Sequence, residues 1–402
     1  MNPSLKYLHP YPFEQLSGLL RGITPNPDLA PIRLSIGEPK HPTPACILDA
    51  LKQTLETGVA TYPASAGSEA LRTTIADWLM RRYRLGNNSI HADQQVLPVA
   101  GTREGLFAVT QALVDTQSKP LIMMPNPFYQ IYEGAALLAG GQPLLLNTTA
   151  DNNYQPLLEP VTTEQWAGCG LIYLCSPGNP NGKTLPQSFW EALLAKQQQY
   201  GFVVVADECY SELYRDETAP PLGLLEACNA MGNSDYTGCL VFHSLSKRSN
   251  APGLRSGFVA GDPHLIAAFR QYRTYHGCAL PNHVQAASIA AWSDEAHVIK
   301  NRQAYREKFN RAGDVLQSAL SYTEPDAGFY LWLPVPGGDD ENFARELYKT
   351  MAVTVLPGRY LSRPTPEGDP GAGYVRVALV AEPEICEDAL ARINAFASSY
   401  QK

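Results

Sequence analysis

The sequence predicts an α/β protein with a large domain around a mostly parallel sheet and a smaller α+β domain made from both chain ends. Three observations predict this. Short, unbroken apolar runs alternate with helix-period segments in the middle of the chain, prolines interrupt residues 11–44, and the pattern changes again in the last third. Apolar strands that are separated by helices are typical of a sheet buried on both faces.

The strands of the large domain are expected where the apolar runs fall. The pattern of Leu106, Val109 and Leu113 and the stretch 187–200 indicate helices between them. A turn-rich connection of about a dozen residues joins Phe242 to the apolar run 258–260. This connection is barely long enough for a helical crossover between parallel strands, so we expect the strand at 258–260 to run antiparallel to the strand at 240–242. The predicted strands are 96–99, 121–124, 171–174, 202–206, 240–242 and 258–260.

The two chain ends have a different character. Because a helix cannot run through Pro25, Pro27 and Pro31, we expect residues 11–44 to form an irregular arm on the body of the protein. The last third predicts a long helix at 292–320, strands at 328–333 and 374–379, a Pro- and Gly-rich loop at 362–373 and a closing helix through Ile385, Ala389, Ile393 and Phe396. We therefore predict a large domain at 45–291 and a small domain at 1–44 plus 292–402.

Composition excludes several classes of function. The 402 residues carry 31 Lys and Arg against 39 Asp and Glu, so the surface lacks the basic footprint of a nucleic-acid-binding protein. Any anion must be held by a few placed cations. Apolar runs such as 202–206 are far shorter than the ~18 residues of a membrane helix. The eight cysteines show no C-x-x-C spacing and no zinc pattern, which predicts reduced, buried thiols, no metal and a cytoplasmic protein.

Polar residues follow the predicted strands at the point where each strand ends. In open α/β sheets ligands bind beyond these carboxyl ends. Gly101 and Thr102 open a helix, whose free backbone N–H groups suit an anion. An acid directly after five apolar residues, Asp207, needs a cationic partner. The other strand ends supply Phe128 and Tyr129, Asn179, Tyr210, and Ser244 with Lys247 and Arg255.

These residues together suit an aromatic aldehyde cofactor that bears a phosphate. A lysine forms a Schiff base with an aldehyde. A carboxylate keeps a pyridine nitrogen protonated and so maintains an electron sink. A phosphate favours the two-pronged guanidinium of arginine. Each residue alone also has an ordinary structural explanation, such as a helix cap or a core aromatic ring.

The ordered set resembles the fold-type-I pyridoxal-phosphate aminotransferases of class I/II along essentially the whole chain. This family implies a three-layer αβα large domain. The matching motifs are Ser244-Leu-Ser-Lys247 with Gly253-Leu-Arg255-Ser-Gly257, Asn179-Pro-Asn-Gly182, Asp207-Glu-Cys-Tyr210, Ile36-Gly37-Glu38-Pro39, Tyr62-Pro63 and Arg376 in a late strand. One departure is Asn181, where the family usually has Thr.

The resemblance implies a role for each matched residue. Lys247 forms the Schiff base with pyridoxal 5'-phosphate and moves the proton, and Asp207 pairs with the pyridine nitrogen. Tyr210 donates a hydrogen bond to the phenolic oxygen and, with Asn179, tunes the Schiff base. Tyr129 stacks on the ring, in preference to Phe128. Gly101, Thr102, Arg103, Ser244 and Arg255 form the phosphate cup, and Tyr62 reaches the phosphate of a neighbouring subunit, which implies a homodimer. Arg376 binds the substrate α-carboxylate, and Gly37 belongs to a segment over the substrate.

Four further segments resemble the N-succinyldiaminopimelate aminotransferases within this family: 10–14, 36–42, 101–104 and 125–134. The resemblance implies ping-pong transamination between N-succinyl-LL-diaminopimelate and 2-oxoglutarate in lysine biosynthesis. Within the family, an aminotransferase for aspartate, an aromatic amino acid or acetylornithine is the alternative.

Other classes of protein fit less well. Ser244-x-x-Lys247 has the Ser-x-x-Lys spacing of serine acyl-transferases, but the downstream Ser-Asp-Asn and Lys-Thr-Gly are missing. Gly178 and Gly182 precede Lys183-Thr184, but a phosphate loop needs four residues between its glycines and this segment has three. A cofactor-binding regulator would need an appended DNA-binding module, which the sequence does not indicate.

Overall fold

The computed structural model describes residues 1–86, 89–115, 117–316, 320 and 322–400. Its central sheet consists of β2 Val96–Val99, β3 Leu121–Asn126, β4 Gln142–Asn147, β5 Cys169–Cys175, β6 Val203–Asp207, β7 Cys239–Ser244 and β8 Gly257–Gly261. The strand order is β2-β8-β7-β6-β5-β3-β4. Neighbours from β4 to β7 are parallel, whereas β8 runs antiparallel to both β7 and β2, as the short connection predicted.

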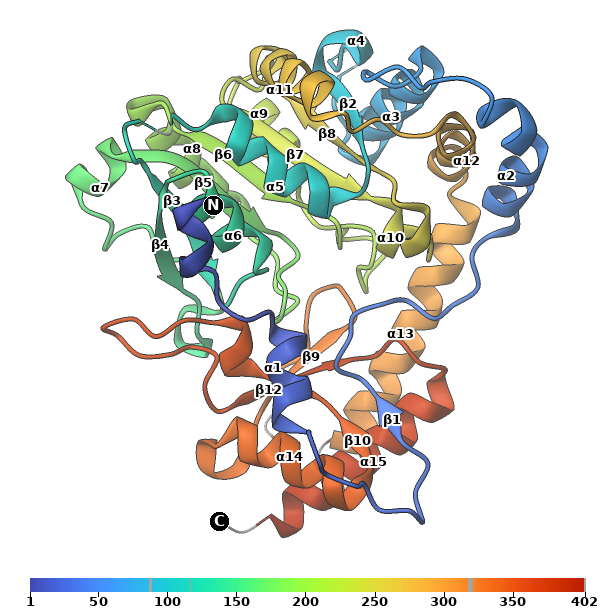
Figure 1. Cartoon of the computed structure of the whole chain (residues 1–402), viewed down its shortest axis with the longest axis vertical. Coiled ribbons are helices and arrows are strands. Elements are labelled where there is room, and N and C mark those ends of the chain that lie inside the picture. The colour runs from blue at the N-terminus through green and yellow to red at the C-terminus, as the bar shows by residue number, and fades with distance from the viewer. Residues whose placement is uncertain (87–88, 116, 317–319, 321, 401–402) are drawn as a thin grey trace.

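Helices cover both faces of this sheet (Figure 1). They are α2 Ala45–Gly58, α3 Glu69–Arg82, α4 Ala92–Gln95, α5 Thr102–Leu113, α6 Ile131–Leu138, α7 Thr163–Ala167, α8 Gln187–Tyr200, α9 Leu224–Ala230, α10 Leu245–Arg248, α11 Pro263–His276 and α12 Asn282–Ser293. Successive strand residues point to opposite faces. Thus Leu171 and Tyr173 pack with α5 and α6, whereas Ile172 and Leu174 pack with α3, α8 and α12. The predicted three-layer αβα architecture with a mostly parallel sheet is confirmed.

The edge strand β4 is the one strand of this sheet that the sequence did not reveal. Its residues are mostly part-exposed, and Gln142, Pro143 and Asn147 interrupt the apolar pattern. A proline is tolerated at a sheet edge, where one side of the strand needs no partner. The weak signal therefore follows from the position of β4 at the end of the sheet.

The last third forms a second core below the central sheet (Figure 1). Its strands β11, β12 and β9 make an antiparallel sheet in that order, and β10 pairs in parallel with β1 near the other chain end. Ile32 and Leu34 share a hydrophobic cluster with α13, α14 and α15, so both chain ends contribute to one core. The elements are β1 Ile32–Arg33, α13 Ala296–Leu316, β9 Tyr330–Pro334, α14 Asp340–Met351, β10 Val353–Thr354, β11 Leu356–Pro357, β12 Tyr374–Ala378 and α15 Pro383–Ser399. The boundaries at 45 and 291 stay a prediction.

Two expectations about the chain ends need correction. The arm predicted at 11–44 is not irregular throughout, because α1 spans Pro12–Leu19, with proline at the first helical position, where its missing N–H costs nothing. The long helix predicted at 292–320 is interrupted. The helix α12 ends at Ser293 and α13 begins at Ala296, and Asp294 accepts N–H groups of the new helix. Residues 317–319 of that prediction lie outside the described residues.

Within the described ranges, no helix combines the length and the apolar character needed to cross a membrane.

Candidate active site

A cavity of about 500 Å³ lies where β5, β6 and β7 end, and it brings together most of the predicted site residues. The N-terminal segment and β9 and β12 of the C-terminal part close it from the other side. The predicted residues that line it are Gly37, Thr102, Arg103, Tyr129, Asn179, Asp207, Tyr210, Ser244, Lys247, Arg255 and Arg376. The strand-end argument therefore located the cavity correctly.

Asp207 is a carboxylate withdrawn from water at the end of β6. Its side chain is 2% exposed. The Tyr132 hydroxyl donates to Oδ2 at 2.8 Å, and the backbone N–H of Cys209 donates to Oδ1 at 3.3 Å. Burial raises the pKa of Asp207. A desolvated carboxylate of this kind is stabilised by a cation, so a ligand with a protonated ring nitrogen suits the position.

Lys247 presents its amine to the cavity from α10, directly after β7. Nζ donates to the carbonyl oxygen of Gly37 and lies 5.2 Å from the centre of the Phe329 ring. Burial lowers the pKa of Lys247 to about 8. More of this amine is therefore neutral, and thus nucleophilic, near neutral pH than in an ordinary lysine.

An anion cradle lies beside the start of α5. Gly101 has a φ of 85°, and a Cβ at this position would collide with Nη2 of Arg255. Arg255 donates from Nη1 to the carbonyl of Pro252 at 2.9 Å. Ser244 caps α10 by accepting the N–H of Ser246 at 3.1 Å, and both hydroxyls line the cavity. Glycine keeps the guanidinium close to the N–H groups of α5, an arrangement suited to phosphate.

Arg376 extends from β12 into the cavity although it is 4% exposed. Its Nη1 donates to Oδ1 of Asn179 at 3.0 Å and its Nη2 to the carbonyl of Ser35 at 2.9 Å. The guanidinium carbon lies 4.3 Å from the centre of the Tyr330 ring. Nε has no hydrogen-bond partner among the described residues. A fixed, incompletely satisfied guanidinium is a good receptor for a carboxylate.

Two tyrosines link the central sheet to the C-terminal part. The hydroxyls of Tyr210 and Tyr330 are 3.2 Å apart. Burial, and then the neighbouring Tyr330, raise the pKa of Tyr210 well above its usual range, so its hydroxyl keeps its proton. The Tyr330 hydroxyl occupies the space that a side chain at Gly37 would need. The absence of a side chain at Gly37 thus lets its carbonyl reach Lys247.

Arg103 and Tyr129 form the outer wall of the cavity. Nε of Arg103 donates to the Tyr129 hydroxyl at 2.8 Å, and Nη2 donates to the Tyr11 hydroxyl at 3.2 Å. Of the two aromatic candidates, Tyr129 lines the cavity, whereas Phe128 is 1% exposed and belongs to a hydrophobic cluster. Tyr129 is thus the one of the two that a ligand could touch, and its stacking on the cofactor ring stays a prediction.

Tyr62 lies apart from the other predicted residues. It is not part of the cavity lining, and its side chain is fully exposed at 102%. Gly101 is also absent from the lining, but its contact with Arg255 places it directly behind the cradle. A role for Tyr62 in a neighbouring subunit stays a prediction.

Sequence reasoning missed several lining residues. Cys175 and Cys209 were expected to be buried core thiols, yet both line the cavity beside Asp207. All eight cysteines are free in this structure. Tyr132 was also missed; it does not line the cavity itself but supports the lining residue Asp207 from α6. Tyr330 carried no local signal, because it reaches the cavity only through the pairing of β9 with β12.

Comparisons with known proteins agree with this geometry. The profile of the family described as aminotransferase class I and II matches residues 30–393. A solved aminotransferase from Neisseria meningitidis Z2491 is 48% identical, with a TM-score of 0.94, over 99% of this chain and 100% of that one. An LL-diaminopimelate aminotransferase of Maridesulfovibrio salexigens is 29% identical over 97% of each chain. A probable N-succinyldiaminopimelate aminotransferase from Thermus thermophilus is 26% identical, with a TM-score of 0.82, over 96% of this chain and 99% of that one.

The fold and the cavity together define an enzyme that transfers amino groups with pyridoxal phosphate. The chain belongs to the aminotransferase class I and II family. The cofactor of this family is pyridoxal 5'-phosphate. The Asp207 carboxylate, the Lys247 amine and the Gly101–Arg255 cradle fit its ring nitrogen, aldehyde and phosphate.

Proposed function

We propose that the chain transfers the amino group of N-succinyl-LL-diaminopimelate to 2-oxoglutarate, with Lys247 as the lysine that binds the cofactor. One observation carries the choice of substrate. The cavity is lined by Arg103, Arg255 and Arg376, and none of the three forms an ion pair with a carboxylate among the described residues. With Arg255 assigned to the phosphate of the cofactor, Arg103 and Arg376 remain for the substrate, which favours a substrate with a distal carboxylate besides its α-carboxylate and no distal ammonium group.

The cofactor supplies an aldehyde that accepts the amino group and a ring that withdraws electrons. Asp207 holds the proton on the ring nitrogen, and Tyr132 and the Cys209 N–H keep its carboxylate in place. Arg376 binds the substrate α-carboxylate with the donors that Asn179 and Ser35 leave free. Each of these groups is positioned before substrate arrives, which favours catalysis.

Lys247 moves the proton at the substrate Cα. Its amine is next to the Gly37 carbonyl, and its pKa of about 8 leaves a neutral fraction of about one tenth at pH 7. A base with a pKa near the working pH is both present in the right form and able to return the proton. The Tyr210 hydroxyl, which stays protonated, donates a hydrogen bond within the same cavity.

Arg103 is our candidate for binding the distal end of the substrate. Arg255 is next to Gly101 in the phosphate cradle and Arg376 emerges beside Asn179, whereas Arg103 lies on the outer wall with two tyrosine hydroxyls as its partners. Its positive charge is therefore available to a further carboxylate. This role goes beyond the sequence-based prediction, which gave Arg103 only to the phosphate.

Free LL-diaminopimelate is the second candidate substrate, because several relatives of 29–30% identity are LL-diaminopimelate aminotransferases. Its distal end carries an ammonium group as well as a carboxylate. The acid at the cavity mouth that could accept an ammonium is Glu38, which already pairs with Lys40. Succinylation removes this positive charge and adds a carboxylate, so the positive charge of Arg103 on the outer wall favours the succinylated compound.

Single-turnover half-reactions test the choice. The panel comprises N-succinyl-LL-diaminopimelate, LL-diaminopimelate, acetylornithine, aspartate and phenylalanine, each followed by the absorbance of the cofactor. We expect kcat/KM to be at least about tenfold higher for the succinylated donor than for any other. A faster reaction with LL-diaminopimelate would overturn the proposal in favour of the second candidate.

An Arg103→Gln variant tests the role of the wall. We expect it to lower kcat/KM for the succinylated donor by about 10- to 100-fold while leaving phenylalanine unchanged, since only the former has a distal carboxylate. Arg270→Gln, an exposed position on α11, is the matched control. An equal loss with both donors would assign Arg103 to the cofactor.

The exposed Tyr62 supports a homodimer in which each subunit completes the other's phosphate site. Tyr62→Phe should then weaken cofactor binding, although this residue does not line the cavity of its own chain. A monomeric, fully active protein in size-exclusion chromatography would contradict this.

The chemistry also fits the predicted cytoplasmic location, which localisation of a tagged chain would test.

A further inference from the structure

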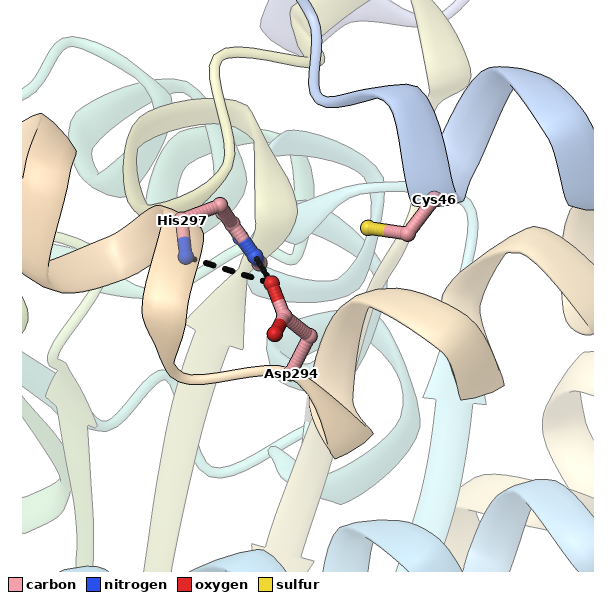
Figure 2. A group of neighbouring side chains, drawn as sticks. All are labelled: Cys46, Asp294 and His297. Carbon is pink, nitrogen blue, oxygen red and sulfur yellow. Dashed lines mark hydrogen bonds and ion pairs between the residues drawn. The ribbon is translucent and has the colours of Figure 1, made fainter.

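A second cluster of reactive side chains lies outside the cavity, between α2 and the start of α13 (Figure 2). Cys46 is in the first turn of α2, Asp294 stands between α12 and α13, and His297 is in the first turn of α13. One ligand atom of each, a thiol sulfur, a carboxylate oxygen and a ring nitrogen, lies within 4.8 Å of the others. None of these three residues lines the cavity.

We propose that Cys46, Asp294 and His297 bind a divalent zinc-like cation that ties α2 to α13, with water as the fourth ligand. Sulfur, imidazole nitrogen and carboxylate oxygen are the donors that zinc prefers, and three protein ligands plus water form a usual open site. Ligand atoms around a tetrahedral zinc lie about 3.3–3.6 Å apart. His297 Nδ1 and Asp294 Oδ2 are 2.6 Å apart here, so shifts on the order of 1 Å complete the site.

The imidazole of His297 is already held in the orientation that a ligand needs. Its Nδ1 faces Asp294, and its Nε2 lies 2.8 Å from the hydroxyl of Ser249, a fully buried residue. A metal-binding histidine usually engages its second nitrogen in such a hydrogen bond, which fixes the ring and its tautomer. Ser249 serves both states, because its hydroxyl donates to Nε2 without metal and accepts from Nε2–H with it.

The charges of the cluster also suit a divalent cation. A Cys46 thiolate and the Asp294 carboxylate together balance two positive charges. Burial and the Asp294 carboxylate raise the pKa of Cys46, so the thiol is protonated in the metal-free protein. Binding releases that proton, while the imidazole keeps one proton, which moves from Nδ1 to Nε2. Among the described residues, no lysine or arginine forms an ion pair with Asp294. The nearby Arg248 forms its ion pair with Glu295 instead.

A second triad, Glu104, His276 and Cys278, meets the same distance criterion but lacks this freedom. Glu104 already forms an ion pair with Arg273, whose side chain is 0% exposed. Recruiting Glu104 to a metal would leave the Arg273 charge buried without a partner, which is strongly unfavourable. The two triads therefore differ in a way that an experiment can use.

The test is titration calorimetry of the chelator-treated holoenzyme with zinc chloride. We expect about one ion bound per chain, with release of about one proton in buffers of different ionisation enthalpy. Cys46→Ser and His297→Gln should each weaken binding at least tenfold, and zinc should raise the melting temperature of the parent but not of Cys46→Ser. The matched control Cys278→Ser should bind as the parent does.

Cobalt(II) provides a second readout, because a thiolate-bound tetrahedral ion absorbs in the visible region beyond the cofactor band. This absorbance should appear in the parent and in Cys278→Ser and vanish in Cys46→Ser. If the parent binds no zinc, or if binding is lost in Cys278→Ser and kept in Cys46→Ser, the proposal is wrong. Asp294→Asn, which keeps the shape of the side chain, separates loss of a ligand from loss of folding.

Discussion

Lys247 and Lys308 are two lysines that the fold withdraws from water for opposite purposes. Lys308, on α13, is 1% exposed, and its Nζ lies 2.6 Å from Nε2 of His41 and donates to the carbonyl of Leu379 at 3.2 Å. Lys247 has the Gly37 carbonyl as its hydrogen-bond acceptor and faces the cavity. Burial lowers the pKa of both residues. A lowered lysine pKa alone therefore does not mark a catalytic residue.

The two lysines are connected by a hydrogen-bonded chain. Because an ammonium group can only donate, Nε2 of His41 accepts from Lys308, and Nδ1–H donates to Oδ1 of Asn301 at 2.9 Å. Nδ2 of Asn301 donates to the backbone carbonyls of Lys247 and Arg248 at 3.1 and 3.2 Å. Lys308 thus helps to position the backbone of Lys247, and of the two lysines Lys247 is the one that lines the cavity. Substitutions in and around the two lysines can break or sharpen this division.

Replacing Lys247 should have the largest effect. Lys247→Ala removes the amine that we propose binds the cofactor and moves the proton, so we expect turnover to fall by at least about 10⁴-fold. The visible absorbance of the bound cofactor should change at the same time. Lys308→Met is the control, and it should keep the parent spectrum. A Lys247→Ala variant with full activity would refute the assignment.

Asp207→Ala should cause the second largest loss of turnover, on the order of 10³-fold, because the ring nitrogen of the cofactor would lose its charged partner. The cofactor should stay bound, since the cradle around Arg255 is untouched. Absorbance of the dialysed protein measures binding, and single-turnover rates measure the chemistry. Tyr132→Phe, which removes one hydrogen bond to Asp207, should cost far less. Similar losses in both variants would show that position rather than charge matters.

Arg376→Ala should weaken amino-acid substrates by about 100-fold in kcat/KM without releasing cofactor, because the α-carboxylate loses a two-pronged donor. Arg376→Lys keeps the charge but not the planar fork, and should restore only part of the loss. The comparison uses cofactor content together with kcat/KM. Loss of the cofactor from Arg376→Ala would place this arginine in the phosphate site.

Uptake of pyridoxal phosphate by cofactor-free protein should depend on pH through Lys247. Its pKa is lowered to about 8 by burial, so the neutral amine becomes more abundant as pH rises. We expect the uptake rate to rise about tenfold per pH unit below 8 and to level off above it. Stopped-flow absorbance measures this. A profile that levels off only near the ordinary lysine pKa would show that burial does not tune this amine.

The sequence predicted the strands and the strand-end residues well because both are local signals. An apolar run marks a buried strand, and the residue after it reaches the sheet edge wherever the neighbours lie. Asp207, Asn179 and Lys247 were found in this way. The strand β4 and the short helix α1, which begins at Pro12, were not predicted, because their sequences carry only a weak periodic pattern.

The remaining parts of the site depend on contacts between distant segments. His41 and Lys308 are 267 positions apart, and Tyr210 and Tyr330 are 120 apart, so no local pattern pairs them. A lysine in an amphipathic helix such as α13 is ordinarily solvated, and here the N-terminal segment around His41 and the chain around Leu379 pack against that helix and bury it. Long-range packing thus decides which of two similar lysines becomes reactive.

Lys308→Met should have the smallest effect on activity and a clear effect on stability. We expect turnover to change less than about tenfold, because Lys308 touches no group in the cavity, and the free energy of unfolding to fall by about 1–3 kcal/mol, because His41 and the Leu379 carbonyl lose a donor. Burial, and then the Lys308 charge, lower the pKa of His41, so that pKa should rise in the variant. Urea unfolding and NMR titration of His41 measure these changes, with the exposed Lys349→Met as control. A loss of turnover as large as that of Lys247→Ala would erase the distinction between the two lysines.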